Sequence, residues 1–231
     1  MRTKSEIREF VWRILEERGV ARFPKPIKGR IPNFLGAEQA AERLRRSEYY
    51  QRAKVVFCNP DSPQRPVREI VLRDGKTLVM ATPRLRQGFI LLREVPASFV
   101  RRASTIRGAF EFGKLVDPKD LDSIDVKITG SVAVSPDGGR VGKGKGYSDL
   151  EYGILGELGL IGPETPVLTT VHDLQIVKEI PREPHDMPVH LIFTPTRTIR
   201  TEARGEPKIR WDLITEELLE QIPLLRKLKG T

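Results

Sequence analysis

Residues 142–149 spell Gly-Lys-Gly-Lys-Gly-Tyr-Ser-Asp, and an apolar run from Leu150 to Leu160 follows directly. Alternating glycines let successive backbone N–H groups turn toward one point, which makes a concave nest for an anion. Glycines also lack a Cβ atom, so the backbone can approach that anion closely. A helix that begins after the loop adds the partial positive charge of its first turn. The segment therefore predicts a phosphate-binding loop followed by a helix.

The side chains of this loop favour the same interpretation. Lys143 and Lys145 supply two positive charges, and Asp149 supplies a carboxylate for a metal ion on the same phosphate. Tyr147 follows the last glycine, where its ring can stack on a planar ligand or its hydroxyl can meet a phosphate. The spacing matches neither the Walker pattern nor the dinucleotide-binding turn. A flexible basic turn is the alternative, because short Gly/Lys runs occur in many surface loops.

The composition sets outer limits on the fold and its location. A chain of 231 residues suits one sizeable α/β domain, with two small domains as the alternative. No apolar run approaches the roughly 18 residues of a membrane-spanning helix, and no secretory signal is evident. Cys58 is the single cysteine, and three histidines accompany it, which argues against a disulfide or a structural zinc site. We expect a soluble, cytoplasmic protein.

The charge balance is strongly basic, with 40 Lys and Arg against 31 Asp and Glu and a net charge of +9. Such a balance suits a nucleic-acid partner. It equally suits a substrate that carries several negative charges, or simple solvation of the surface. The Arg-rich segments are not interleaved with aromatic residues, as a platform for stacked bases would require.

Short apolar strands alternate with helical patterns along the chain. Helices are expected at 4–18, 36–50, 67–72, 150–160 and 211–227, and strands at 54–58, 77–81, 123–134 (one strand or a pair), 167–171 and 191–194. This alternation indicates a three-layer αβα fold, Rossmann-like, with a mostly parallel sheet and helices on both faces. We expect a single domain over 1–231. An N-terminal helix and a Pro-rich ordered loop fill 1–35, and a C-terminal helical extension, interrupted at Pro223, fills 205–231.

Ligands of such sheets gather at the carboxyl ends of the strands. Arg84 and Arg86 follow one predicted strand, His172 follows another, and Thr194 to Arg197 follow a third. The two arginines suit a carboxylate or phosphate of a small anionic substrate, and His172 suits the lining of its pocket. In the first helix, Lys4 and Arg8 lie one turn apart on the same face, so both can point at one ligand.

The loop at 142–149, with Pro136 to Val141 before it, resembles the signature of the 5-formyltetrahydrofolate cyclo-ligase (methenyltetrahydrofolate synthetase) family. Lys4 and Arg8 reproduce the family's Lys-x-x-x-Arg. The residues Gln175, Ile180, Pro181 and Asp186 are similar to its Gln…Ile-Pro…Asp segment. The resemblance extends over about residues 4–200.

The resemblance implies an ATP- and Mg²⁺-dependent ligase that converts 5-formyltetrahydrofolate to 5,10-methenyltetrahydrofolate. It assigns the ATP phosphates to Lys4, Arg8, Gly142, Lys143, Gly144, Lys145, Gly146, Tyr147 and Asp149. It also implies that Asp149 and Asp186 hold Mg²⁺, and that Lys145 and Tyr147 take part in catalysis.

Several residues depart from the enzyme pattern. Ser148 stands where the enzymes have a second tyrosine, Lys143 replaces a common arginine, and 62–68 lacks the family's pterin-contacting glutamate. The segments 23–26, 29–34, 82–86 and 149–152 resemble a divergent branch, the methenyltetrahydrofolate synthetase domain-containing proteins. Two alternatives therefore accompany the cyclo-ligase. One is an ATP-binding module with another metabolite or a regulatory role, and the other is a nucleic-acid-binding protein.

Overall fold

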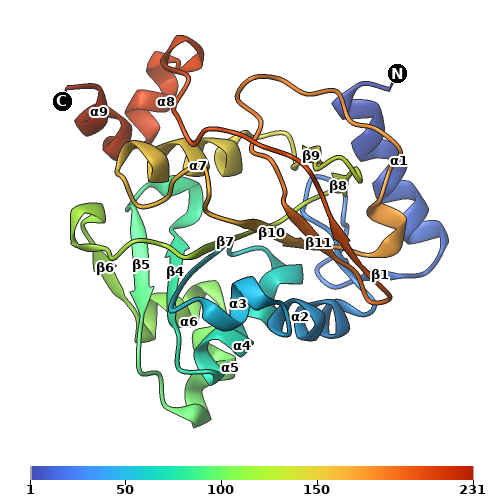
Figure 1. Cartoon of the computed structure of the whole chain (residues 1–231), viewed down its shortest axis with the longest axis horizontal. Helices are drawn as coiled ribbons and strands as arrows, with labels where there is room; N and C mark the ends of the chain where they lie inside the picture. The colour runs from blue at the N-terminus through green and yellow to red at the C-terminus, as the bar shows by residue number, and fades with distance from the viewer. Residues whose placement is uncertain (1, 231) are drawn as a thin grey trace.

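The computed structural model describes residues 2–230, and an eight-stranded sheet forms its centre (Figure 1). The strands follow the order β12, β11, β10, β7, β3, β4, β5, β6 across the sheet. Five neighbours run parallel: β11 (Leu191–Phe193), β10 (Val167–Thr170), β7 (Val126–Thr129), β3 (Val55–Cys58) and β4 (Thr77–Ala81). The outer strands pair antiparallel with their neighbours: β12 (Thr198–Arg200) at one edge, and β5 (Phe89–Leu92) and β6 (Lys114–Val116) at the other side. The predicted mostly parallel sheet is confirmed.

The central strands have the composition of a sheet that is covered on both faces. Every residue of β3, β7 and β10 is buried, and Val, Ile and Thr make up most of the three strands. Such continuous burial is typical of parallel strands with helices on either side, whereas a half-exposed sheet would alternate apolar and polar residues.

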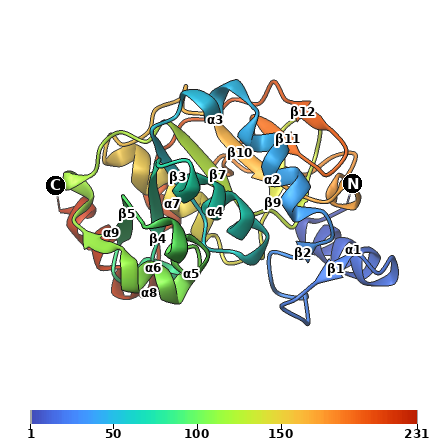
Figure 2. The same ribbon diagram turned by 90° about the horizontal axis from the view of Figure 1, so that it is seen from below.

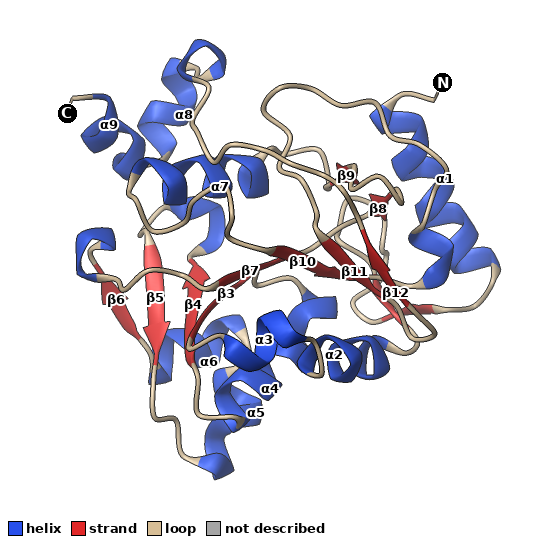
Figure 3. Ribbon diagram, viewed as in Figure 1, coloured by secondary structure: helices blue, strands red, loops and turns tan. Residues whose placement is uncertain are grey.

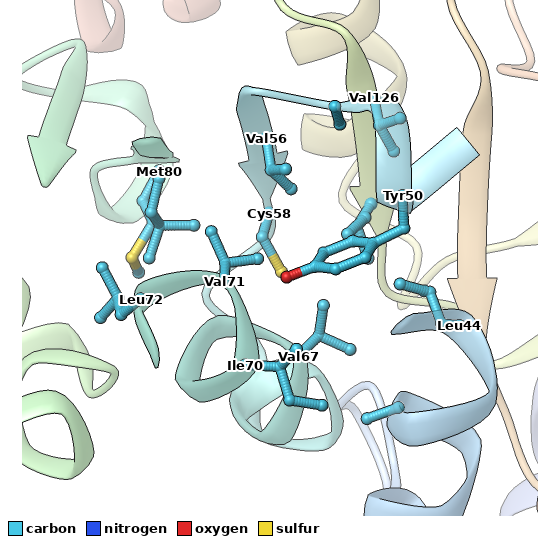
Figure 4. Packing of buried hydrophobic residues seen from close by; sticks show 14 of the residues in the cluster. Leu44, Tyr50, Val56, Cys58, Val67, Ile70, Val71, Leu72, Met80 and Val126 are labelled. Atoms are coloured by element: carbon cyan, nitrogen blue, oxygen red, sulfur yellow. The ribbon is translucent and has the colours of Figure 1, made fainter. Parts of the chain in front are cut away.

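One face of the sheet is covered by helices from the first half of the chain. They are α2 (Ala37–Arg45), α3 (Glu48–Arg52), α4 (Arg65–Arg73), α5 (Val100–Ala103) and α6 (Ile106–Phe112), seen in front of the strands in Figure 2. Tyr50 of α3 and Val67 and Val71 of α4 pack toward Val56 and Cys58 of β3 (Figure 4). Burial raises the pKa of the Cys58 thiol to about 11, which fits a core residue rather than a reactive one.

The opposite face is covered by α7 (Tyr147–Glu157) together with α8 (Glu216–Gln221) and α9 (Pro223–Lys229) from the C-terminal extension (Figure 3). Ile154 and Leu155 of α7 and Leu219 and Leu225 of the extension share a cluster with Phe57 of β3. Helices on both faces complete the predicted three-layer fold.

The N-terminal helix α1 (Lys4–Glu17) lies beside the sheet, next to the short hairpins β1 (Ala21–Arg22)–β2 (Asn33–Phe34) and β8 (Ala133–Val134)–β9 (Arg140–Val141). Thr3 and Glu6 form a capping box at its start. Its apolar stripe, which includes Ile7 and Val11, packs against Val141.

The structure corrects some of the expected elements. The helix expected at 36–50 is two helices, because the Ser47 hydroxyl accepts the N–H of Tyr50 and starts α3 after α2 has ended. The helix expected at 211–227 is a single 3₁₀ turn at Trp211–Leu213 followed by α8 and α9. Strands β5, β6 and β12 and helices α5 and α6 were not expected. Within residues 2–230, no helix combines the length and apolar character that a membrane crossing requires.

Candidate functional site

The glycine-rich loop connects β9 to α7, as the sequence predicts. Gly144 has φ +91° and Gly146 has φ +69°, a left-handed conformation that residues with a side chain rarely adopt. Gly146 is also the N-cap of α7, so the free N–H groups of the first helical turn point toward the loop. Both glycines therefore shape a turn that leads the chain from a strand into the start of a helix.

A pocket of about 230 Å³ opens over this loop. Its walls come from α1, the chain after β3, the loop itself and the segment before β11. The lining residues are Lys4, Arg8, Ile31, Asp61, residues 140–149, Glu183, His185 and Asp186. The pocket therefore unites every residue that the sequence assigned to the phosphates and the metal.

The pocket lies where a doubly wound sheet places its ligands. Strand β4 lies on one side of β3, and β7, β10 and β11 lie on the other, so the strand order reverses between β3 and β7. Asp61 follows β3, and Gly130 follows β7; the Arg140 guanidinium donates to the Gly130 carbonyl at 2.9 Å. The carboxyl ends of the two strands at this switch point thus form the floor of the site.

Arg8 attaches α1 to the loop. Its Nε donates to the Gly142 carbonyl at 2.7 Å, and a Cβ atom added at Gly144 would lie 3.4 Å from its Cζ. Burial and the nearby Arg140 charge lower the pKa of the Arg8 guanidinium below its usual value. An anion in the pocket would relieve this repulsion between cations.

Arg140 and Asp149 form an ion pair at the base of the pocket. The Arg140 side chain is 2% exposed and that of Asp149 18% exposed. Burial tends to raise the pKa of the Asp149 carboxyl, but the Arg140 charge and the Met187 N–H hydrogen bond at 3.0 Å outweigh it and lower the pKa. Arg140 Nε is a buried donor without an acceptor among the described residues.

Lys4 joins two carboxylates at the other wall. Its Nζ lies 2.6 Å from Glu183 and 2.7 Å from Asp186. Burial lowers the pKa of the Lys4 ammonium, but the hydrogen bonds to Asp186 and Glu183 outweigh this and raise it. Glu183, His185 and Asp186 each bring one ligand atom to within 4.8 Å of the others. The carboxylates of Glu183 and Asp186 are oxygen ligands of the kind that Mg²⁺ prefers. In this structure the Lys4 ammonium neutralises both of them.

The two loop lysines differ in their surroundings. Lys143 Nζ pairs with Asp61 at 3.0 Å. The exposed Lys145 side chain has neither a hydrogen bond nor an ion pair to any residue within 2–230. The pocket lining carries five Lys and Arg side chains against four carboxylates, and the glycines add backbone N–H groups, which suits an anion such as a phosphate chain.

A buried polar network holds α7 against the sheet beneath the pocket. Asn59, just after β3, donates to Glu151 of α7 at 2.5 Å, and Lys127 of β7 lies 3.5 Å from the same carboxylate. The Lys127 ammonium also stands 4.1 Å from the centre of the Phe57 ring. These contacts link the helix that carries Tyr147 and Asp149 to β3 and β7.

Three residues that the sequence assigned to the substrate lie outside the pocket. Arg84 and Arg86 are exposed beyond the end of β4. His172 begins a 3₁₀ turn, where its Nδ1 accepts the N–H of Leu174 at 3.1 Å, and its ring packs edge-on against Phe34. The role of all three in substrate binding stays a prediction without support from their position.

Three charged pocket residues were not predicted as site residues: Asp61, Arg140 and Glu183. Arg140 and Glu183 each stand within a few positions of a predicted site residue. Asp61 is 82 residues from its partner Lys143, and only the adjacency of β3 and β7 brings it to the loop. Its position directly after a buried strand was the available signal.

Comparisons with known protein families and sequences agree with the family resemblance of the glycine-rich loop. The family model described as the 5-formyltetrahydrofolate cyclo-ligase family matches residues 1–195. A methenyltetrahydrofolate synthase domain-containing protein of Mus musculus is 43% identical over 98% of the chain, and that of Homo sapiens is 41% identical over 99%. The chain spans only 63% and 62% of the lengths of these two relatives.

The fold also matches solved structures. The NMR structure of a 5,10-methenyltetrahydrofolate synthetase from Aquifex aeolicus has a TM-score of 0.52 and 20% identity, over 91% of this chain and 99% of that one. At this identity the likeness concerns the fold alone.

Proposed function

Because the chain belongs to the 5-formyltetrahydrofolate cyclo-ligase family, we propose that it binds ATP at the glycine-rich loop and acts as a Mg²⁺-dependent cyclo-ligase on 5-formyltetrahydrofolate. The observation that carries the proposal is Lys145, which has no partner within residues 2–230 and lies beside Gly144 and Gly146 in a pocket lined by more Lys and Arg than Asp and Glu. Charge of this kind suits a triphosphate, and the first turn of α7 adds to it.

In the proposed reaction, the formyl oxygen attacks the γ-phosphorus and ADP leaves. The N10 nitrogen then attacks the formyl carbon and releases its proton, and phosphate leaves to give 5,10-methenyltetrahydrofolate. Lys4, Arg8, Lys143 and Lys145 neutralise and orient the phosphates, so the protein contributes positioning and charge rather than a nucleophile. Tyr147 would lie against the reacting groups at the start of α7.

Asp186 and Glu183 would hold Mg²⁺ after Lys4 turns from them toward the phosphates. The ion supplies additional neutralisation of the triphosphate. Asp149 suits a water-mediated contact better than a direct one, since its carboxylate already accepts hydrogen bonds from Arg140 and Met187.

A second candidate function is binding of ATP for a reaction on another acid substrate. Ser148 in place of the second tyrosine favours it. So does the lining of the pocket, in which Tyr147 is the only Phe, Tyr or Trp among the described residues. A pterin ring would find little apolar surface there.

One experiment separates these functions. The protein is incubated with 5-formyltetrahydrofolate, ATP and Mg²⁺, and the methenyl product is followed by its near-ultraviolet absorbance, with ATP binding measured by calorimetry in parallel. Product that requires all three components supports the cyclo-ligase. ATP binding without product supports the second candidate, and absence of ATP binding contradicts both.

A further inference from the structure

A second cavity, of about 180 Å³, adjoins the phosphate pocket on the side of the C-terminal extension. We call it the C-terminal groove. Its lining consists of Lys145, Gly146, Asp149, Leu150, His185, Lys208, Ile209, Arg210, Leu213, Ile214 and Leu218. The first three of these residues and His185 also line the phosphate pocket, so the two cavities meet across the end of the glycine-rich loop.

The wall formed by residues 208–218 is fixed firmly to α7. A Cβ atom at Gly156 would lie 1.7 Å from the Pro207 carbonyl oxygen, so the extension rests directly on the helix backbone. The Ile209 N–H donates to Glu157 at 3.3 Å, and the Tyr152 hydroxyl donates to the Gly205 carbonyl at 3.3 Å. In Figure 1 the chain after β12 passes α7 on its way to α8. The groove is therefore preformed rather than made by a mobile tail.

This wall lies outside the part of the chain that the family model matches, residues 1–195. The mouse relative, in contrast, aligns over 98% of the chain and so includes nearly all of the extension. One wall of the C-terminal groove thus comes from a segment that this relative shares and that the family match does not include.

We propose that the C-terminal groove receives the base of the nucleotide whose phosphates lie on the glycine-rich loop. The inference rests on the proposed binding of ATP. Five aliphatic side chains face the groove: Leu150, Ile209, Leu213, Ile214 and Leu218. Apolar walls of this kind cover the faces of a planar heterocycle, while the shared residues Lys145 and Gly146 lie where the sugar would join base and phosphates.

The charges around the groove favour a neutral ring over an anionic group. Lys208 pairs with Glu206 at 2.6 Å, and Arg210 pairs with Asp212 at 3.0 Å. Both cations at this edge are therefore already neutralised by their neighbours, in contrast to Lys145 on the side of the phosphate pocket. A polyanionic folate tail would find less attraction here than in the phosphate pocket.

The test compares ATP with inorganic tripolyphosphate, which has the phosphates without sugar or base. Leu213 is 49% exposed, so Leu213→Ala can be made without opening the core. We expect this variant to raise the Kd for ATP about fivefold and to leave the Kd for tripolyphosphate unchanged. Leu35→Ala is the matched control, because Leu35 is also 49% exposed and lines neither cavity.

The possible results of this binding test separate the assignment of the groove from the proposed function. An unchanged Kd for ATP in Leu213→Ala, or an equal loss for ATP and tripolyphosphate, overturns the assignment of the groove. A selective loss of 5-formyltetrahydrofolate binding also overturns it and gives the groove to the folate ring. If the unmodified protein binds neither ATP nor tripolyphosphate, the proposed function itself is wrong.

Discussion

Asp149, in the first turn of α7, receives two contacts from a single nitrogen of Arg140 in β9, at 2.9 and 3.0 Å. The pair spans the glycine-rich loop, since one partner precedes the loop and the other follows it. With the guanidinium 2% exposed, this contact closes the base of the loop in the free protein. Asp149, which the sequence analysis assigned to a metal ion, therefore also stabilises the loop through its ion pair with Arg140.

Asp149→Asn should lower the free energy of unfolding by about 3 kcal/mol at neutral pH, because it leaves the buried Arg140 charge uncompensated. The folded-state pKa of Asp149 is below its usual 3.8, so its stabilisation is present above that value and is lost as pH falls through the lower folded pKa. Urea unfolding at about pH 7 and about pH 3 measures both effects. Asp122→Asn, which removes the exposed partner of Arg93, is the control and should cost less than about 1 kcal/mol.

Asp186→Asn should weaken the Mg²⁺ dependence of ATP binding more than Asp149→Asn does. Asp186 pairs with the partly exposed Lys4 ammonium, accepts the Glu183 N–H and lies near His185, whereas Asp149 is held by the buried Arg140 guanidinium and the Met187 N–H. Calorimetric titration of ATP at several Mg²⁺ concentrations gives the comparison. Wild-type Mg²⁺ dependence in both variants would mean that the two carboxylates are structural.

The sequence alone predicted the layers of the fold and much of the pocket, because both depend on local patterns. Short apolar runs such as 77–81 indicate central strands. The alternating glycines indicate a turn before a helix, and this signal does not depend on distant residues. The apolar run at 89–92 was missed, since four residues are too few to separate a strand from a helix by periodicity.

The parts of the site that could not be predicted from the sequence are contacts between residues far apart in the chain. The sequence gives no local sign that Asp61 neutralises Lys143, or that Lys4 meets Glu183, 179 residues away. Placing Arg84 and His172 near the loop relied on the common edge of the parallel strands. That edge is shared, but these strand ends lie to either side of the switch point and away from the pocket.

Lys145→Ala should weaken ATP binding about tenfold, and Lys143→Ala should have a smaller effect. Each charge-assisted hydrogen bond contributes roughly 1.5–3 kcal/mol. Lys143 must first leave Asp61, which offsets part of its gain, whereas Lys145 has no partner to leave among the described residues. Lys119→Ala serves as control, because Lys119 is exposed and lines neither cavity. Unchanged affinity in the double variant of Lys143 and Lys145 would remove the basis for the phosphate site.

The protein should lose stability as the pH falls below about 6.5, because two histidines are held neutral in the fold. His172 and His190 accept backbone N–H bonds through Nδ1, and burial lowers the pKa of both. Between the unfolded and the folded pKa values, the unfolded chain binds more protons than the folded state. The free energy of unfolding therefore falls as the pH falls through this range. His172→Asn keeps an acceptor for Leu174 and should reduce this slope between about pH 6.5 and pH 5 in urea unfolding. An identical slope in the variant would exclude His172 as a source of it.

Turnover of 5-formyltetrahydrofolate should be slow, below roughly 1 s⁻¹, even with ATP saturating, whereas metabolic enzymes typically reach about 1–10³ s⁻¹. Tyr147 is the only Phe, Tyr or Trp in the described lining of the phosphate pocket, and its hydroxyl already contacts Gln221 of the C-terminal extension at 3.4 Å. Ser148 offers no second ring for the pterin. Losing a buried partner for a polar ligand group costs about 1–3 kcal/mol, which is roughly 5- to 150-fold in affinity. Stopped-flow absorbance of the methenyl product measures the rate, and Ser148→Tyr should raise it if the missing ring is the cause. A rate in the range of metabolic enzymes for the unmodified protein would show instead that the pocket accepts the pterin as it stands.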